Sequence, residues 1–188
     1  MRSVATAAVI LFAACSPSQE PFLISKNETL SAAALNTKAA AHFKGKYALP
    51  KATFAVDIYN VAYDSVDWLG RKRKLTGCVA FPQGSAPRGV VLFYHGTISD
   101  RRLSPSRYNG SQTETEAELA IGAFATAGFA VAAPDYIGLG DSPGAHPYPL
   151  ASINGSSGID LLRIVRPMAK QLNVSVGPKD YVAGYSEG

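Results

Sequence analysis

The sequence contains little cysteine and no long apolar run. Its 188 residues include two cysteines, Cys15 and Cys78, which are too few for a disulfide framework and do not have the spacing of a metal site. No stretch reaches the length of about 20 apolar residues that a membrane-spanning helix needs. Because 47% of the residues are hydrophobic and 17% are charged, we expect one globular core and not a disordered chain.

The small excess of basic residues does not indicate a nucleic-acid partner. Eighteen lysines and arginines against fourteen acidic residues give a formal net charge of +4. Apart from one tetrad at residues 71–74, the basic residues are scattered, and no aromatic-rich basic groove accompanies them. We interpret the tetrad as a solvated charge run, with contact to lipid headgroups as the alternative.

The first fifteen residues predict an export signal. An uncharged apolar stretch follows Arg2 and ends in small residues before Cys15, and it is too short to span a bilayer. Residues 11–15 resemble a bacterial lipobox, in which Cys15 is acylated and holds the chain at a membrane surface. Ser16 then favours the outer membrane in a Gram-negative source. Cleavage near Ala14 and release from the membrane is the alternative.

The remaining chain divides near residue 51. Residues 16–50 show no sustained strand pattern, and we interpret them as a tether. Alternating apolar positions at 53–66 and a strand-like run at 75–81, separated by a turn signal at 67–70, predict an antiparallel hairpin. The folded domain is therefore predicted to cover residues 51–188.

Three later segments predict strands of a parallel sheet. Residues 89–94 are continuously apolar, as a strand buried on both faces must be. Residues 129–133 and 181–185 have the same character. The predicted fold class is α/β, with a mostly parallel sheet preceded by the antiparallel hairpin.

Capping signals place helices between these strands. Thr113 with Glu116 fits a capping box, and Gly128 stands where a left-handed C-terminal cap is needed. Ser157 with Asp160 offers a second helix start before the last strand. The sequence therefore indicates a series of strand, helix and strand units.

The last strand is followed by a G-x-S-x-G pattern, formed by Gly184, Tyr185, Ser186, Glu187 and Gly188. In a nucleophile elbow, a serine on a sharp strand-to-helix turn adopts a strained backbone, and the two flanking glycines let neighbouring chain pass closely. We predict Ser186 as the catalytic nucleophile and both glycines as its structural support.

A second segment agrees with this interpretation. The first parallel strand is followed by His95, Gly96 and Thr97. In a fold with a nucleophile elbow, this position supplies one amide of an oxyanion hole. We assign the two oxyanion donors to the backbone amides of Thr97 and Glu187, and expect the carboxylate of Glu187 to be solvated. His95 and Gly96 are predicted to support the loop structurally.

Residues 53–188 resemble the first half of bacterial and fungal secretory-lipase-type α/β-hydrolases. The motifs YHGT at 94–97, APDYIGLGDS at 133–142, HPY at 146–148 and GYSEG at 184–188 follow the order of that family. The resemblance implies hydrolysis of carboxylic esters, such as acylglycerols, by a serine, an acid and a histidine. It implies no metal and no organic cofactor.

The resemblance also implies that the acid and the catalytic histidine follow the nucleophile. The three histidines of this chain, His42, His95 and His146, all precede Ser186. We therefore expect residues 51–188 to be the N-terminal part of a hydrolase domain whose C-terminal half is absent. A serine without a positioned base is a poor nucleophile, so the 188 residues alone are predicted to have little turnover.

Two other functions stay open at this point. A serine peptidase of the same fold shares the elbow, and a catalytically silent surface lipoprotein would keep the fold without the chemistry. The expected partners are an ester or acylglycerol substrate and, through an acylated Cys15, a membrane. The expected location is outside the cytoplasm, either on the bacterial outer membrane or secreted.

Overall fold

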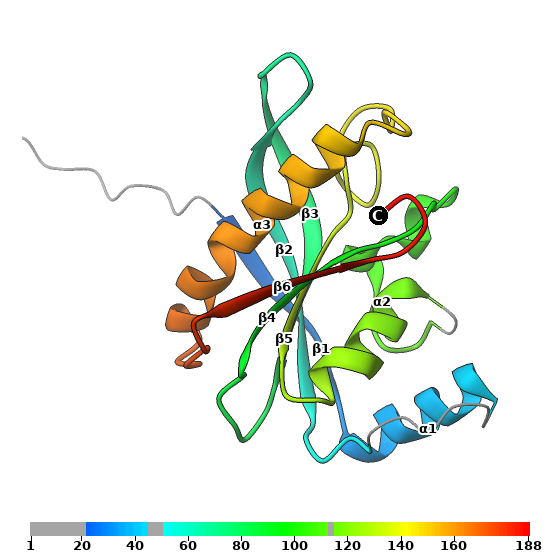
Figure 1. The fold of residues 1–188 in the computed structure, drawn as a ribbon, viewed down its shortest axis with the longest axis vertical. Coiled ribbons are helices and arrows are strands. Elements are labelled where there is room, and N and C mark those ends of the chain that lie inside the picture. Colours follow the sequence, from blue (N-terminus) through cyan, green and yellow to red (C-terminus); the bar gives the residue numbers. More distant parts are fainter. Residues whose placement is uncertain (1–21, 45–50, 113–114) are drawn as a thin grey trace, which may run out of the picture.

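The computed structural model describes residues 22–44, 51–112 and 115–188. One six-stranded sheet runs through the molecule in the order β1-β2-β3-β5-β4-β6 (Figure 1). The strands are β1 (Phe22–Leu30), β2 (Val56–Val66), β3 (Lys72–Pro82), β4 (Gly89–Tyr94), β5 (Ala130–Pro134) and β6 (Lys179–Gly184). The pairs β1-β2, β2-β3 and β3-β5 are antiparallel, whereas β4 pairs in parallel with both β5 and β6.

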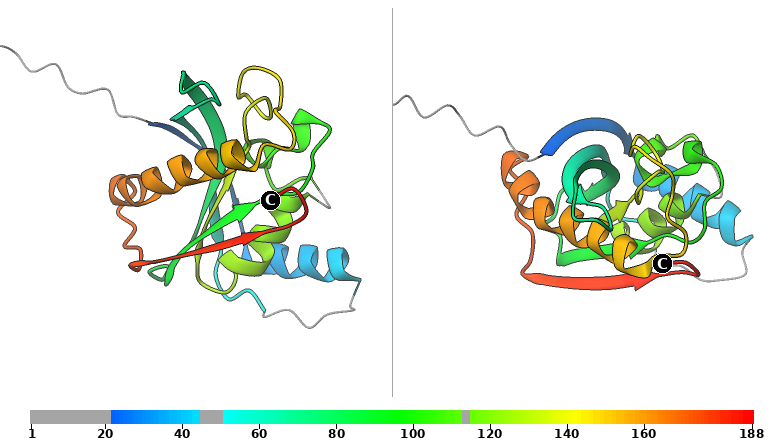
Figure 2. Two further views of the ribbon diagram at one scale, coloured as in Figure 1. Left: turned by 45° about the horizontal axis from the view of Figure 1, so that its top comes forward. Right: turned by 90° about the horizontal axis from the view of Figure 1, so that it is seen from above.

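Helices cover both faces of this sheet (Figure 2). The long helix α3 (Ala151–Gln171) lies on one face, while α1 (Ala32–Phe43) and α2 (Glu116–Ala120) lie on the other. A π-helical turn at Ile121–Ala125 continues α2, and two short 3-10 turns, Arg101–Leu103 and Pro105–Arg107, follow β4. The resulting three-layer arrangement confirms the predicted α/β class.

The core is split between the two faces of the sheet. In β4, Leu92 belongs to the cluster beneath α3, and Phe93 belongs to the cluster beneath α1 and α2. All six residues of β4 are buried, as the continuous apolar run predicts for a strand covered on both sides. The predicted hairpin is also confirmed, because β2 and β3 pair in register from Val56 opposite Pro82 to Val66 opposite Lys72.

The prediction of a tether at residues 16–50 is wrong for the described part of that segment. β1 forms the edge of the sheet and pairs with β2, from Phe22 opposite Tyr63 to Leu30 opposite Val56. α1 follows at once, with the Ser31 side chain accepting a hydrogen bond from the amide of Ala34. The strand pattern was hidden because most of β1 is exposed or half-buried and a register shift interrupts it. The predicted signal segment and Cys15 lie outside the described residues.

Both α2 and α3 begin at residues other than those that the capping signals predict. α3 begins at Ala151, well before Ser157, whose hydroxyl donates within the helix to the carbonyl of Asn154. α2 is capped by Thr115, whose side chain accepts from the amide of Glu118 at 3.2 Å, while Thr113 lies outside the described residues. The left-handed cap at Gly128 is confirmed by its φ of 84°.

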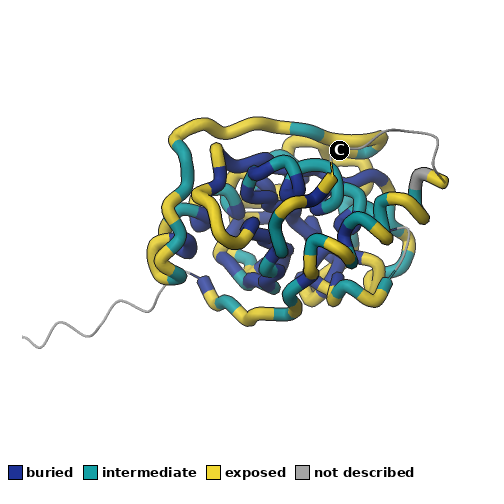
Figure 3. The backbone as a smooth tube through the Cα atoms, turned by 90° about the horizontal axis from the view of Figure 1, so that it is seen from below, coloured by how far each residue is buried: buried dark blue, intermediate teal, exposed yellow. Residues whose placement is uncertain are grey.

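β6 forms the other edge of the sheet. It pairs with β4, and its residues are mostly exposed (Figure 3). Tyr181 and Val182 are 42% and 69% exposed, although both are large apolar side chains.

The packing of α3 on the sheet predicts a clear difference between two residues of that helix. Leu161 is fully buried in the core, whereas Ile159 is 41% exposed. We expect Leu161→Ala to lower the free energy of unfolding by about 2–5 kcal/mol, because it leaves a cavity in packed surroundings. Ile159→Ala is expected to change it by about 0.5 kcal/mol or less. Urea denaturation followed by circular dichroism measures both, and equal losses would contradict the proposed packing.

Candidate active site

The elbow stands at the carboxyl end of β6. The chain leaves β6 at Gly184, and Ser186 then adopts a φ of 55°, in the left-handed region that non-glycine residues rarely occupy. The amide of Gly188 closes the turn by donating to the carbonyl of Tyr185 at 3.0 Å. Ser186 is exposed. The strained backbone and the exposed side chain agree with the predicted nucleophile elbow.

Glycine is required on both sides of Ser186 by close passages of the backbone. A side chain at Gly184 would collide with the carbonyl of Gly188, and one at Gly188 would collide with the carbonyl of Tyr94. Such contacts with main-chain atoms cannot be relieved by turning a side chain. The spacing of the two glycines is therefore a consequence of how tightly the turn folds against β4.

The parallel pairing of β4 with β6 brings the predicted oxyanion loop to the elbow. Tyr94 lies opposite Gly184, and the carbonyl of Tyr94 accepts a hydrogen bond from the amide of Tyr185 at 3.2 Å. A side-chain carbon built at Gly96 would lie 3.3 Å from Cβ of Ser186. The loop after β4 and the serine thus face each other with room only for glycine.

Glu116 of α2 fixes this loop, a role that the sequence did not suggest. Its Oε2 accepts a hydrogen bond from the amide of Gly96 at 2.6 Å. Burial raises the pKa of Glu116, although the hydrogen bond from Gly96 acts in the opposite direction. Among the described residues, the amides of Thr97 and Glu187 make no hydrogen bond to another backbone group.

His95 is held as a neutral, buried ring behind the loop. Its Nδ1 lies 2.7 Å from the carbonyl oxygen of Gly96, and because a carbonyl only accepts, Nδ1 carries the proton. The ring stacks on Tyr136 with centroids 4.1 Å apart, and the Tyr136 hydroxyl donates to the His95 carbonyl at 2.9 Å. Burial lowers the pKa of His95. This geometry agrees with a structural role for His95 and not with proton transfer.

The expectation that the Glu187 carboxylate is solvated is wrong. Its side chain is 1% exposed, because the turn directs it inward between α3 and the loop that follows β5. Oε1 lies 2.8 Å from Nε2 of His146 and accepts from Nδ2 of Asn154 at 2.9 Å. The residue after the candidate nucleophile is therefore tied through its side chain to two other segments.

His146 is held through both of its ring nitrogens. Nδ1 of His146 lies 3.0 Å from the carbonyl oxygen of Ile137, and Nε2 faces the Glu187 carboxylate. Both ring nitrogens of His146 are therefore engaged by oxygen atoms of other segments. Nε2 is committed to Glu187, which leaves His146 no free nitrogen to activate Ser186.

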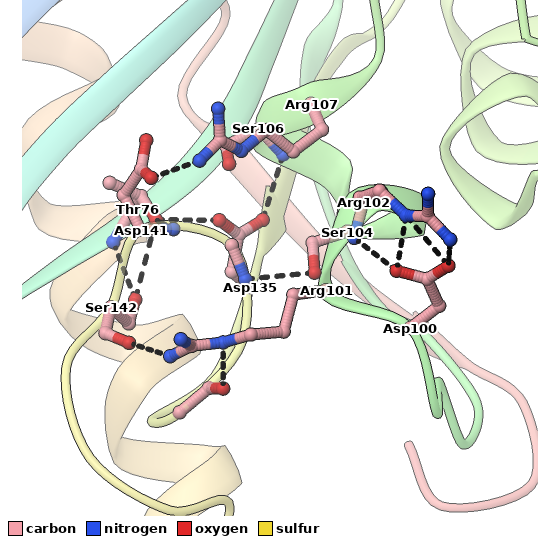
Figure 4. Close-up of polar contacts among 12 residues, drawn as sticks. Thr76, Asp100, Arg101, Arg102, Ser104, Ser106, Arg107, Asp135, Asp141 and Ser142 are labelled. Atoms are coloured by element: carbon pink, nitrogen blue, oxygen red, sulfur yellow. Dashed lines mark hydrogen bonds and ion pairs between the residues drawn. The ribbon is translucent and has the colours of Figure 1, made fainter.

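The loop after β5 is fixed by a buried carboxylate (Figure 4). Asp135 is fully buried and accepts from the Thr76 hydroxyl at 2.6 Å and from the Ser106 amide at 2.8 Å. Burial raises the pKa of Asp135. Arg101 donates to two carbonyl oxygens of the same loop, at 2.7 and 2.6 Å. These contacts fix the loop to β3 and to the two 3-10 turns that follow β4.

Fold and site together define the class of the molecule. The mixed sheet has helices on both faces, antiparallel pairs on the side of β1, β2 and β3, and parallel pairs of β4 with β5 and β6, with a serine turn directly after β6. This arrangement is the α/β-hydrolase fold. No protein-family model matches the chain, and no curated protein matches it either.

Several solved structures match the chain closely in shape. A Legionella pneumophila protein classed provisionally as a hydrolase superposes with a TM-score of 0.77 at 27% identity, over 88% of this chain and 44% of that one. The rice cell wall degrading esterase LipA from Xanthomonas oryzae gives 0.72 at 22% identity, over 92% and 44%. Candida antarctica lipase A in its closed state gives 0.53 at 14% identity, over 88% and 35%.

The chain spans less than half the length of each of these three proteins. Among residues 22–44, 51–112 and 115–188, no three histidine, cysteine, aspartate or glutamate side chains gather as a metal ion requires. In the same residues no helix has the length and apolar character to cross a membrane.

The buried contacts of Glu187 predict a graded effect of substitution on stability. Glu187→Ala leaves the buried donors of His146 and Asn154 without an acceptor, so we expect it to lower the free energy of unfolding by about 1–3 kcal/mol. Glu187→Gln keeps one acceptor oxygen and should cost less. Thermal and urea unfolding measure both, with the exposed Glu28→Ala as the control. Equal stability of Glu187→Ala and Glu28→Ala would show that the carboxylate is solvated after all.

Proposed function

We propose that this chain carries the nucleophile and the oxyanion hole of a serine hydrolase that cleaves carboxylic esters. Ser186 is the nucleophile, and the backbone amides of Thr97 and Glu187 are the oxyanion donors. The single observation that carries the proposal is the exposed Ser186 at a φ of 55°, packed against Gly96 at the end of a parallel strand.

The reaction follows from this geometry. The Ser186 hydroxyl attacks the ester carbonyl carbon while a general base removes its proton, and the carbonyl electron pair moves onto oxygen. The two amides stabilise that oxyanion, a contribution of about 3 kcal/mol for each well-aimed donor. Collapse of the intermediate breaks the bond to the alcohol oxygen, which takes the proton back from the base as the alcohol leaves. Water then attacks the acyl-enzyme by the same steps and releases the acid and the free Ser186 hydroxyl.

The general base is assigned to none of the described histidines near the elbow. The ring of His95 is buried and bonded to Gly96, and His146 is bonded to Glu187 and Ile137. The matched structures are more than twice as long as the matched region. We therefore assign the base and its acid partner to residues outside the 188, and the activity is proposed for the whole protein.

We further propose that the substrates are acyl esters and not peptides. One matched structure is an esterase that degrades rice cell walls and another is a lipase, which favours acyl esters over peptides for this chain. A peptidase of the same fold would share the elbow and the oxyanion loop. The choice between them is made by comparing acyl esters with aminoacyl amides as substrates.

Replacing the nucleophile tests the proposal directly. In the whole protein, Ser186→Ala should abolish labelling by a fluorophosphonate and reduce kcat on p-nitrophenyl esters by about 10⁴-fold or more. The exposed Ser175→Ala should keep both. A faster reaction with aminoacyl p-nitroanilides than with esters would identify a peptidase. A folded wild-type protein that takes no label would identify a silent member of the fold.

We also propose that the protein is exported and anchored through an acylated Cys15. The support is the sequence of the first fifteen residues alone. Radiolabelled palmitate should enter the wild-type protein when it is expressed in a bacterium, and Cys15→Ser should remove the label. Cys78 is buried and serves as the matched control, because Cys78→Ser should leave the label in place. Absence of label from the wild type would rule out the anchor.

A further inference from the structure

The tip of the β2–β3 hairpin exposes two large apolar side chains. Trp68 is 49% exposed and Leu69 is 64% exposed, at the centre of a turn where polar residues and glycine are usual. Trp68 is also the one tryptophan of the sequence. We call residues 66–71 the hairpin tip.

Hydrogen bonds to Asp67 hold the hairpin tip in a fixed shape. Oδ1 of Asp67 accepts from the amides of Leu69 and Arg71 at 2.9 and 3.0 Å, and Oδ2 accepts from the side chains of Arg71 and Arg73 at 2.8 and 2.7 Å. Burial by itself would raise the pKa of Asp67, but these hydrogen bonds hold it well below its ordinary value. The apolar pair is therefore presented by a pre-formed turn, and no ordering has to accompany binding.

A basic collar lies directly behind the hairpin tip. It consists of residues 71–74, of which Arg71 and Lys74 are 55% and 49% exposed at the side chain. Across residues 64–74, four basic side chains face two carboxylates, which leaves a net charge of +2. Asp67 pairs with Arg71 and Arg73, and Asp64 pairs with Lys74 at 2.6 Å, so the collar keeps that net charge of +2.

The hairpin tip projects from the same end of the molecule as the candidate active site. β3 is antiparallel to β5, and Gly77 lies opposite Pro134, the last residue of β5. Five further residues, from Lys72 to Thr76, carry β3 about 16 Å past that point at the usual rise of a strand. The elbow stands at the carboxyl end of β6, which runs parallel to β4 and therefore to β5. Figure 1 shows the hairpin rising clear of the helices.

We propose that the hairpin tip docks on an anionic phospholipid surface. Trp68 and Leu69 enter the interfacial layer, where tryptophan is favoured because one edge of its ring is apolar and the other donates a hydrogen bond. The basic collar contacts the phosphate groups of anionic headgroups, which attract clustered lysine and arginine. The apolar pair thus lies in the interfacial layer of the membrane, and the basic collar behind it lies at the level of the headgroup phosphates.

Docking in this manner sets the candidate active site toward the lipid. This consequence rests on the proposed function, whereas the docking itself does not. Because binding is read from Trp68 and from vesicle sedimentation, Ser186→Ala protein must bind as the wild type does. A hydrolase that fails to dock, and a docking protein that fails to hydrolyse, are therefore told apart.

The experiment uses the whole protein carrying Cys15→Ser, so that no acyl chain contributes to binding. It is mixed with vesicles of phosphatidylcholine alone or with added phosphatidylglycerol. We expect sedimentation with the anionic vesicles and a blue shift of the tryptophan emission that is absent from Trp68→Phe. Leu69→Ser should lower the partition coefficient about tenfold, while Leu23→Ser, at a β1 residue that is 68% exposed, should leave it unchanged.

The charge contribution is measured separately. Replacing Lys72 and Lys74 by glutamine should weaken binding to anionic vesicles roughly fivefold for each lysine and should not affect the neutral ones. Lys170→Gln, on the exposed side of α3, is the matched control. The proposal is overturned if the folded protein binds neither vesicle, or if Leu23→Ser weakens binding as much as Leu69→Ser. It is equally overturned if the emission that Trp68→Phe removes is already blue-shifted without lipid, since protein then covers the tip.

Discussion

The parallel pairing of β4 with β6 is the constraint on which the candidate site depends. It brings the end of one strand, Tyr94, beside the end of the other, Gly184. From that pairing follow the close passage of Gly188 over the Tyr94 carbonyl and the nearness of Gly96 to Ser186. A shift of the register by one residue would move Ser186 away from the loop and turn alternate side chains to the opposite face.

Buried polar contacts then fix what the pairing brings together. Glu116 anchors the amide of Gly96 from one face of the sheet, and Glu187 joins His146 and Asn154 on the other. Each carboxylate is buried or partly buried and bonded to groups that would be costly to leave unpaired. The elbow is thus restrained by side chains from both helical layers. Restraint of this kind is what oxyanion stabilisation requires, because donors that must reorganise lose most of their effect.

The elements with strong local patterns were predictable from the sequence. Strands that are buried on one or both faces leave an apolar pattern in the sequence. β4 shows it as a continuous apolar run, and β2 and β3 show it as two apolar segments separated by a turn signal. β1 was missed because an edge strand exposes most of its residues and needs no apolar pattern. The start of α3 was misplaced because Leu150 offers no capping side chain, and the capping signal of Ser157 with Asp160 lies inside the helix.

The candidate nucleophile was predictable for a different reason. Ser186 sits between glycines whose spacing is set by backbone geometry, and such spacing is visible in the sequence. The roles of Glu116, Asn154 and the Glu187 carboxylate arise from contacts between segments far apart in the chain. From the sequence, a glutamate such as Glu116 in the first turn of a helix is interpreted as a favourable charge near the helix N-terminus. No local pattern predicts that its side chain also binds the loop after β4.

The order of strands in the sheet also constrains how the chain folds. β5 lies between β3 and β4, although it is made after both, so the two earlier strands must leave a gap that a later one enters. β4 acquires its partners only from segments that follow it, β5 and then β6. The elbow and its loop therefore assemble only after long loops have closed. Contacts of such large sequence separation form slowly, and until then the middle strand offers two bare edges to any other chain nearby.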